Sequence, residues 1–146
     1  MRPMWMLTVL LVLTAVPGMA QSRAVTHIDS EKVAAALAGG RGGSLVATKD
    51  FTVSGSFRKV PGQVEVHARE TDIFYVTDGE ATLVVGGTVV GGKTTGPGQI
   101  RGTDIQGGQT QRLKKGDVVT IPAGTAHWFK ELNTPTISYL TVKVLK

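Results

Sequence analysis

The chain has 146 residues, of which 41% are hydrophobic, 18% charged and 5% aromatic, with 19 glycines, 6 prolines and no cysteine. This length and composition fit one compact domain and exclude a disulfide scaffold, a thiolate zinc site, an iron–sulfur cluster and a thiol nucleophile. Any metal site must therefore use nitrogen and oxygen ligands, and three histidines can supply imidazole nitrogen: His27, His67 and His127.

The first twenty residues are typical of an export signal. Arg2 gives a short positive start, residues 4–16 form an apolar run broken only by two threonines, and residues 17–20 place small side chains where a signal peptidase cleaves. A retained anchor is the alternative, but the run is shorter than the roughly 18 to 20 residues that span a bilayer. We expect a signal peptide over residues 1–20, cleavage at about Ala20, no stable membrane anchor and a periplasmic or secreted protein.

The segment over residues 21–43 is predicted to be one short helix and a linker. Asp29 or Ser30 can cap a helix over residues 31–37, because their side chains can accept hydrogen bonds from its first turn. Gly39-Gly40 ends it, since glycine accepts the left-handed conformation of a helix cap.

From Ser44 onward the chain is typical of antiparallel β structure. Short runs rich in valine, isoleucine, threonine and aromatic residues are separated by turns that contain glycine. Ten strands are predicted, at residues 45–49, 51–58, 63–70, 72–78, 81–86, 88–90, 111–114, 117–121, 126–131 and 136–144. So many short strands predict a small barrel or a double-sheet sandwich.

The stretch from Gly86 to Gly108 holds nine of the nineteen glycines and shows little apolar periodicity. It is predicted to be a long, permissive connection between two halves that are rich in strands. Two interpretations stay open for it, a surface loop and a flap over the mouth of a barrel.

The net charge of +5 raises the question of an anionic partner. The basic residues occur as two pairs, Arg58-Lys59 and Lys114-Lys115, and as single residues scattered among acids and glycines. Neither a basic helix nor a basic patch interleaved with aromatic residues is present, and these are the patterns of nucleic-acid binding. We expect a solvated basic surface and no nucleic-acid partner.

Two segments carry side chains that could meet at one point. Glu65 and His67 lie on the same face of a predicted strand, about 6.6 Å apart along it, and Asp72 begins the next strand after a short turn. In the second segment, the turn Pro122-Ala123-Gly124 breaks strand pairing and is followed by His127, the first inward-pointing residue of its strand. The set offers two imidazoles and two carboxylates.

These segments resemble the two motifs of the cupin superfamily. The second motif, G-x5-P-x-G-x2-H-x3-N, is matched by Gly116, Pro122, Gly124 and His127, with Glu131 where asparagine is usual. The first motif, G-x5-H-x-H-x3-4-E-x6-G, is matched with departures when it is aligned on Gly79. Asp72 then stands at the glutamate, His67 at the second histidine and Glu65 at the first.

The resemblance implies an all-β fold, a double-stranded β-helix (cupin or jelly-roll) barrel over residues 44–146, preceded by the short N-terminal helix. It implies a single divalent metal ion, bound by Glu65, His67, Asp72 and His127. Such a nitrogen and oxygen set suits manganese, iron, nickel, cobalt or zinc and does not choose among them. Because cupins often pair, it also implies a homodimer.

The acidic ligand has alternatives. Asp72 is one methylene shorter than the glutamate of the motif and could instead cap the turn between two strands, while Glu70 is a rival acid. If Asp72 or Glu65 does not reach the metal, three ligands remain and the site resembles a triad of two histidines and one carboxylate, with open coordination positions.

Several neighbours have two interpretations. Phe74, Val76 and Phe129 share faces with the candidate ligands and are expected to form a dry wall, or plain core. Tyr75 and Trp128 fall on the opposite faces, where they would pack between sheets or subunits. The roles of three more polar residues are assigned by position alone: Arg112 as an anion contact or a surface residue, Glu131 as an outer acid or a rim charge, and His27 as a surface residue.

Two functions follow. One is an exported metal-dependent enzyme of the dioxygenase, isomerase or lyase type, which acts on a small oxygen-rich molecule. The other is a binding module that carries or senses a small-molecule ligand without catalysis. The fold alone does not decide between them, because one scaffold supports many activities.

Overall fold

The computed structural model describes residues 25–38 and 42–146. The predicted signal peptide and the predicted helix stop at Gly39-Gly40 lie outside these residues. Within the described residues, no helix is long and apolar enough to cross a membrane.

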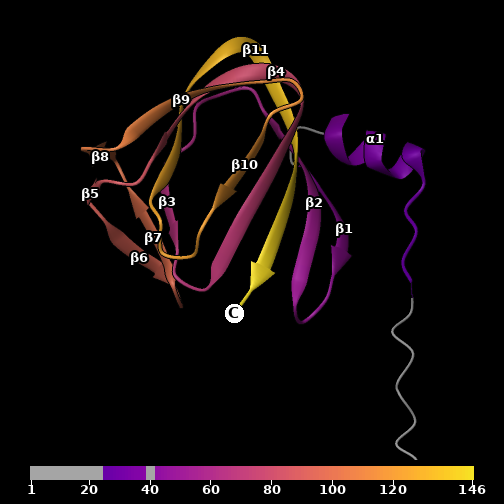
Figure 1. Cartoon of the computed structure of the whole chain (residues 1–146), viewed down its shortest axis with the longest axis horizontal. Helices are drawn as coiled ribbons and strands as arrows, with labels where there is room; N and C mark the ends of the chain where they lie inside the picture. Colours follow the sequence, from indigo (N-terminus) through magenta and orange to yellow (C-terminus); the bar gives the residue numbers. More distant parts are fainter. Residues whose placement is uncertain (1–24, 39–41) are drawn as a thin grey trace, which may run out of the picture.

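The described chain consists of one helix followed by strands (Figure 1). Its elements are α1 (Ser30–Ala38), β1 (Gly43–Ala47), β2 (Phe51–Arg58), β3 (Val64–His67), β4 (Glu70–Val85), β5 (Thr88–Val90), β6 (Lys93–Gly96), β7 (Gln99–Gly102), β8 (Asp104–Gln106), β9 (Gln109–Lys114), β10 (Val118–Ile121) and β11 (His127–Leu145). The predicted all-β class with one short helix is therefore confirmed. Asp29 precedes the helix, and its carbonyl accepts the backbone N–H groups of Lys32 and Val33 at 3.1 Å each.

The strands form two antiparallel layers. Layer one has the order β1-β2-β11-β4-β10 and uses residues 137–144 of β11 and 70–79 of β4. Layer two has the order β9-β4-β11-β3-β7-β6 and uses residues 127–132 of β11 and 80–85 of β4. The long strands β4 and β11 therefore pass from one layer into the other, which makes a jelly roll.

This passage between layers corrects the predicted strand boundaries. The predicted strands 72–78 and 81–86 are one strand, β4, and the predicted strands 126–131 and 136–144 are one strand, β11. The bend in β4 lies at Gly79, which has a φ of +80° and faces the carbonyl of Thr136 so closely that a Cβ would lie 2.1 Å from it. A glycine at which the sequence pattern predicts a turn can therefore instead lie at a bend within one continuous strand.

The core fills the space between the two layers. It consists of Phe74, Val76, Ala81, Leu83, Leu113, Ile121, Phe129, Ile137 and Tyr139, all of them buried. Phe74 packs against the rings of Phe129 and Tyr139, with ring centroids 5.6 Å and 5.1 Å away. The predicted inward positions of Phe74, Val76 and Phe129 are confirmed.

The glycine-rich stretch 86–108 is largely folded, which corrects its prediction as a long connection. β5, at the predicted residues 88–90, pairs with β8, while β7 pairs with both β3 and β6. Ile105 of β8 packs with Val64, Val66 and Val84 on the outer face of layer two. Strands of three or four residues between glycine turns are too short to show an alternating pattern in the sequence.

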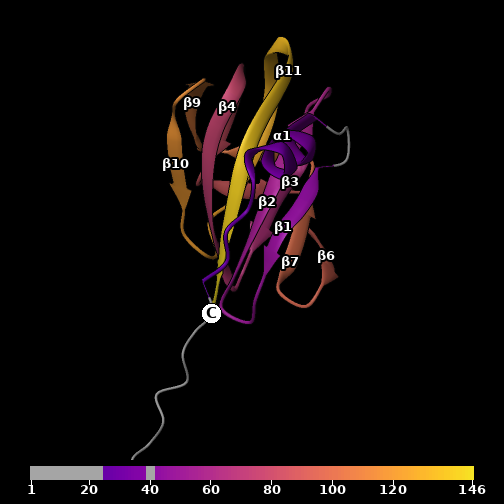
Figure 2. The ribbon, with the colours of Figure 1, turned by 90° about the vertical axis from the view of Figure 1, so that its right-hand side faces the viewer.

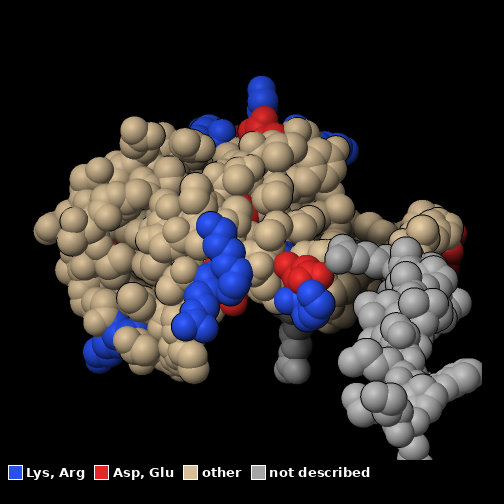
Figure 3. Space-filling view, turned by 60° about the horizontal axis from the view of Figure 1, so that its bottom comes forward, with Lys and Arg blue, Asp and Glu red and all other residues tan. Residues whose placement is uncertain are grey.

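The helix lies on the outer face of layer one. Figure 2 looks onto this side, with α1 in front of the sheet. Gly55 of β2 permits the contact, because a Cβ at this position would lie 2.6 Å from the backbone carbonyl of Ala36. On the face drawn in Figure 3, basic side chains form separate small groups between uncharged areas, as the scattered sequence pattern predicts.

Candidate metal centre

β3 supplies two of the four predicted ligands. Its side chains alternate in direction, so that Val64 and Val66 pack on the outer face of layer two while Glu65 and His67 point between the layers. The side chain of His67 is 6% exposed and that of Glu65 24% exposed. The predicted same-face placement of these two residues is confirmed.

His127 enters the same space from the start of β11. The preceding turn contains Gly124, which has a φ of +82° and donates its backbone N–H to the carbonyl of His67 at 2.8 Å. β11 then pairs His127 with Glu65 on β3. The turn and the strand pairing together fix the imidazole beside β3, as the spacing of the motif predicts.

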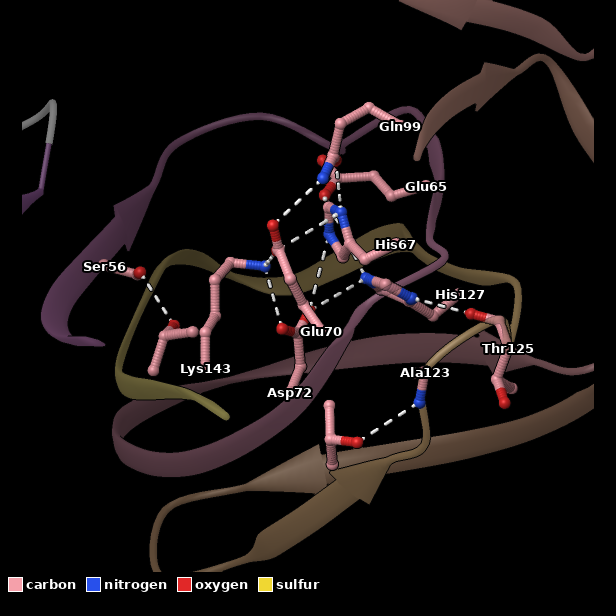
Figure 4. Close-up of polar contacts among 12 residues, drawn as sticks. Ser56, Glu65, His67, Glu70, Asp72, Gln99, Ala123, Thr125, His127 and Lys143 are labelled. Atoms are coloured by element: carbon pink, nitrogen blue, oxygen red, sulfur yellow. Dashed lines mark hydrogen bonds and ion pairs between the residues drawn. The ribbon is translucent and has the colours of Figure 1, made fainter. Parts of the chain in front are cut away.

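Asp72 reaches the site from layer one and faces both histidines (Figure 4). Its Oδ2 atom lies 3.5 Å from Nε2 of His67 and 3.5 Å from Nε2 of His127. Oε2 of Glu65 lies 3.2 Å from Nε2 of His67 and 3.9 Å from Nε2 of His127. Each Nε2 atom therefore lies within 4 Å of one oxygen of Glu65 and one oxygen of Asp72. Two overlapping groups of three could each hold an ion, Glu65 with both histidines and His67 with Glu70 and Asp72.

The alternatives for the acidic ligand can now be compared. Asp72 is 2% exposed and its carboxylate faces the Nε2 atoms of both histidines, so it does not serve as a turn cap. Oε2 of Glu70 lies 3.7 Å from Nδ1 of His67, on the opposite edge of that ring. The geometry favours Asp72 over Glu70 as a partner of the converging nitrogens.

The outward nitrogen of each histidine has an oxygen partner. Nδ1 of His127 lies 3.2 Å from the carbonyl oxygen of Thr125, which can only accept a hydrogen bond. Gln99 of β7 donates from Nε2 to Glu70 at 3.0 Å, which turns its amide oxygen toward Nδ1 of His67. Both rings therefore donate from Nδ1, and in the neutral form their Nε2 lone pairs face the cluster.

Lys143 of β11 is a cation inside this site. Its Nζ lies 2.8 Å from Oδ1 of Asp72 and 2.8 Å from Oε2 of Glu70, and the lysine side chain is 28% exposed. Burial alone would lower the pKa of Lys143, but the hydrogen bonds and charges of Asp72 and Glu70 outweigh it and raise that pKa. The ammonium group is therefore held in its charged form.

Two arginines flank Glu65. Nη2 of Arg58 lies 3.9 Å from Oε1, and Nη2 of Arg101 lies 3.8 Å from Oε2. Burial alone would raise the pKa of Glu65, but the hydrogen bond to His67 and the charges of Arg101, His127 and Arg58 lower it to about 2. The carboxylate is therefore ionised throughout the physiological range.

The two histidines differ in proton affinity. The hydrogen bond to Glu65 raises the pKa of His67 above its usual value of 6.5, against the opposing effect of burial. Burial lowers the pKa of His127 below 6.5. His127 is thus mostly neutral at pH 7 and ready to act as a ligand, whereas His67 keeps its proton to a higher pH than His127 does.

An apolar wall closes one side of the cluster. Phe74 packs edge-on against the ring of His127, with centroids 6.2 Å apart, and Phe129 lies behind Phe74. A small cavity of about 20 Å³ between these rings, Glu65 and Arg58 has room for one water-sized molecule. A metal ion here would therefore be largely shielded from bulk water.

Other residues singled out by sequence lie outside the cluster. His27 and Glu131 are exposed, as is Arg112, which pairs with Glu80 at 2.8 Å, so the surface interpretation holds for all three. Trp128 points to the outer face of layer two and donates from Nε1 to the carbonyl of Gly62 at 2.8 Å. Tyr75 is 46% exposed on the outer face of layer one.

The structure adds residues that the sequence reasoning missed. Lys143, Gln99 and Arg101 come from β11 and β7, far along the chain from the residues they contact. Arg58 ends β2, only seven residues before Glu65. One signal was available for Lys143, because it continues the buried alternation of Ile137, Tyr139 and Thr141. A lysine in such a series must be paired inside the protein.

The chain was compared with known proteins. A family model described as Cupin matches residues 25–144. BH2720 from Bacillus halodurans has a TM-score of 0.60 at 12% identity, over 87% of this chain and 85% of that chain. A Klebsiella pneumoniae protein described as having a double-stranded beta-helix domain has a TM-score of 0.55 at 17% identity, over 90% and 92%.

The cupin domain of Schizosaccharomyces pombe Cnp3 has a TM-score of 0.52 at 15% identity, over 70% of this chain and 59% of that chain. No match was found among curated proteins. At these identities the likeness concerns the fold, and it confirms the double-stranded β-helix predicted from the sequence.

Proposed function

The chain belongs to the cupin family, and from this premise we propose that it binds one divalent metal ion through Glu65, His67, Asp72 and His127. The observation that carries the proposal is the convergence of two Nε2 atoms on one carboxylate oxygen, Oδ2 of Asp72, at 3.5 Å each. Hydrogen-bonding partners on both Nδ1 atoms support it, since metal-binding histidines have such partners almost without exception.

The donor set fits a first-row divalent ion. Two imidazole nitrogens and two carboxylate oxygens suit manganese, iron, nickel, cobalt or zinc. A bound ion of this kind acts as a Lewis acid and a template for a small oxygen-rich molecule. We propose on this basis an exported metal-dependent enzyme of the dioxygenase, isomerase or lyase type, with export resting on the signal-like residues 1–20.

The side chains around the cluster have distinct tasks in this proposal. Gln99 and the carbonyl of Thr125 orient the two imidazoles, so that their Nε2 atoms face Asp72. Phe74 and Phe129 exclude water from one side. Lys143 holds Oδ1 of Asp72 and leaves Oδ2 directed at the histidines.

The test is the metal content of the purified protein, measured by plasma mass spectrometry without added metal or chelator. We expect close to one ion per chain, lost when His67→Ala or His127→Ala removes a nitrogen ligand. His27→Ala is the matched control, because its side chain is 85% exposed and it lies outside the cluster. Full metal occupancy in both cluster variants would refute the assignment.

A second function is favoured by the charge balance of the cluster. Glu65 is flanked by Arg58 and Arg101, while Asp72 and Glu70 share Lys143. The carboxylates therefore have cationic partners without any metal, which suits a module that binds a small molecule and performs no reaction. Absence of metal even after incubation with manganese, iron, nickel, cobalt and zinc would support this second function.

A homodimer belongs to the proposal as well. Tyr75 of β4 and Val118 of β10 are paired neighbours on the outer face of layer one, and they are 46% and 63% exposed. Light scattering during gel filtration measures the mass. A dimer that dissociates in Tyr75→Glu would support contact through this face, and a monomeric wild-type protein would refute it.

A further inference from the structure

A hollow lies next to the cluster, on the inner face of layer one. Its volume is about 380 Å³, within the size range of sites for small molecules. The lining residues are Gly42, Gly43, Ser44, Ser54, Gly55, Ser56, Phe57, Arg58 and Tyr139. No acidic side chain is among these described residues, and one of them, Arg58, carries a positive charge.

Strand pairing aligns hydroxyl groups along the hollow. Ser44 of β1 pairs with Ser54 of β2, and Ser56 of β2 pairs with Tyr139 of β11. Residues 54, 56 and 58 alternate with outward-facing residues, so their side chains share the inner face of the strand. Hydroxyl groups of this kind both donate and accept hydrogen bonds, which suits a ligand that carries hydroxyl groups of its own.

Arg58 joins the hollow to the candidate metal centre. It lines the 380 Å³ hollow and also the small cavity that contains Glu65 and His127. Among the described lining residues it is the one that the two spaces share. A ligand in the hollow could therefore contact the guanidinium group and extend toward the cluster.

The guanidinium group of Arg58 is fixed in place before any ligand binds. Its Nε donates to the hydroxyl of Tyr139 at 2.8 Å, and its Cζ lies 5.1 Å from the ring centroid of Phe129. The carboxylate of Glu65 lies 3.9 Å from Nη2, beyond hydrogen-bond distance. The terminal nitrogens therefore retain donor capacity, and a planar pair of such donors matches a carboxylate.

We propose that this hollow binds a small hydroxylated carboxylate, a hydroxy acid, with its carboxylate on the terminal nitrogens of Arg58 and its hydroxyl groups against Ser44 and Ser54. This inference deepens the proposed function, on which it rests for any reaction, by assigning the class of ligand. Binding itself depends on Arg58 and the serines, so it can be measured without metal.

The experiment is an NMR titration of the metal-free protein with D-gluconate, followed through the backbone amides. Sorbitol is the matched neutral compound, because it offers a similar chain of hydroxyl groups without the charge. We expect D-gluconate to shift the amides of Ser44, Ser54 and Ser56, and sorbitol to bind at least about tenfold more weakly. Equal binding of the two compounds, or no shift with millimolar D-gluconate, overturns the proposal.

Variants locate the binding. Arg58→Gln is expected to weaken D-gluconate binding at least about tenfold. Arg112→Gln removes the same charge from an exposed residue paired with Glu80 and should leave binding unchanged. If Arg58→Gln does not fold, Ser54→Leu fills the hollow while it keeps the guanidinium group, and it should also abolish the shifts. Unchanged binding in the folded variants overturns the proposal.

Metal analysis of the same preparations separates the two proposals. Protein that retains metal but does not bind D-gluconate would leave the metal centre standing and refute the hydroxy-acid site. Protein that binds D-gluconate through Arg58 but never retains metal would support the hydroxy-acid site and refute the metal centre.

Discussion

Nζ of Lys143 lies 2.8 Å from Oδ1 of Asp72, whose other oxygen faces Nε2 of both histidines at 3.5 Å. The lysine is thus placed to neutralise Asp72 when no metal is present. A divalent ion on the opposite oxygen would lie within a few ångströms of the ammonium group, and the two positive charges would repel each other. The same residue should therefore stabilise the metal-free protein and weaken metal binding.

Lys143→Met should separate these two effects. We expect the free energy of unfolding of the metal-free protein to fall by about 1–3 kcal/mol, because the carboxylates of Asp72 and Glu70 lose a charged hydrogen-bond donor. We expect metal affinity to rise about tenfold as the repulsion is removed. Urea denaturation and metal titration measure the two quantities. Lys93→Met, at an exposed strand residue, is the control, and a loss of metal affinity in Lys143→Met would contradict the prediction.

Gln99→Leu tests the orientation of His67. Gln99 connects Nδ1 of His67 to the carboxylate of Glu70, and it keeps Nε2 of the ring directed at the cluster. Loss of such an outer partner lowers metal affinity by about 10- to 100-fold in comparable sites. Calorimetric titration with cobalt(II) or zinc measures the change. Gln111→Leu, at an exposed residue of β9, should have no effect, and equal affinities for the two variants would count against this role of Gln99.

Metal affinity should also depend on pH. The pKa of His67 is raised above 6.5 in the metal-free protein, so binding must displace a proton from Nε2 at pH values below that raised pKa. We therefore expect affinity to be highest above the raised pKa of His67 and to fall by up to about tenfold for each pH unit below it. Titrations on both sides of pH 6.5 give the slope, and a flat profile across this range would be inconsistent with His67 as a ligand.

Stability in acid should follow from Glu65. Its pKa is about 2 in the folded protein, compared with a usual value of 4.5, so the unfolded chain binds more protons between these two pH values. The stabilising effect is present above pH 4.5 and is lost as the pH falls toward 2. In urea denaturation of the metal-free protein, Glu65→Gln should show a shallower loss of stability over this range. An identical slope in the wild-type protein would contradict the assignment.

The close contact between helix and sheet predicts one further effect on stability. In Gly55→Val, the new side chain would meet the backbone of Ala36, so α1 must move away from β2. We expect a loss of about 1–3 kcal/mol, measured by thermal or urea unfolding. Gly96→Ala is the matched control, since a Cβ there meets only the side chain of Gln99 at 3.9 Å. Similar losses in both variants would show that the helix contact is not the cause.

Local patterns in the sequence were sufficient for part of this site. The alternation on β3 places Glu65 and His67 on one face, and the turn before His127 fixes where β11 begins. Both features depend on residues close together in the chain. The predicted inward positions of Phe74 and Phe129 follow from the same alternation.

The remaining parts depend on contacts between distant segments. Lys143 contacts Asp72, which is 71 residues away in the sequence, and Gln99 contacts His67, which is 32 residues away. Gln99 also lies in the glycine-rich stretch, whose short strands show no alternating pattern in the sequence. Arg58 ends a predicted strand, but its orientation toward Glu65 arises only when the two layers pack together. The bend at Gly79 could not be predicted from the sequence, because glycine with a positive φ occurs both in turns and at bends within a strand.

Anomalous X-ray diffraction from crystals of the protein grown with cobalt(II) tests the metal centre most directly. We predict one strong anomalous peak per chain, about 2.0–2.3 Å from Nε2 of His67 and of His127 and from a carboxylate oxygen of Asp72. A map without a peak between these side chains, or with peaks only at exposed residues such as His27, would contradict the proposed metal centre.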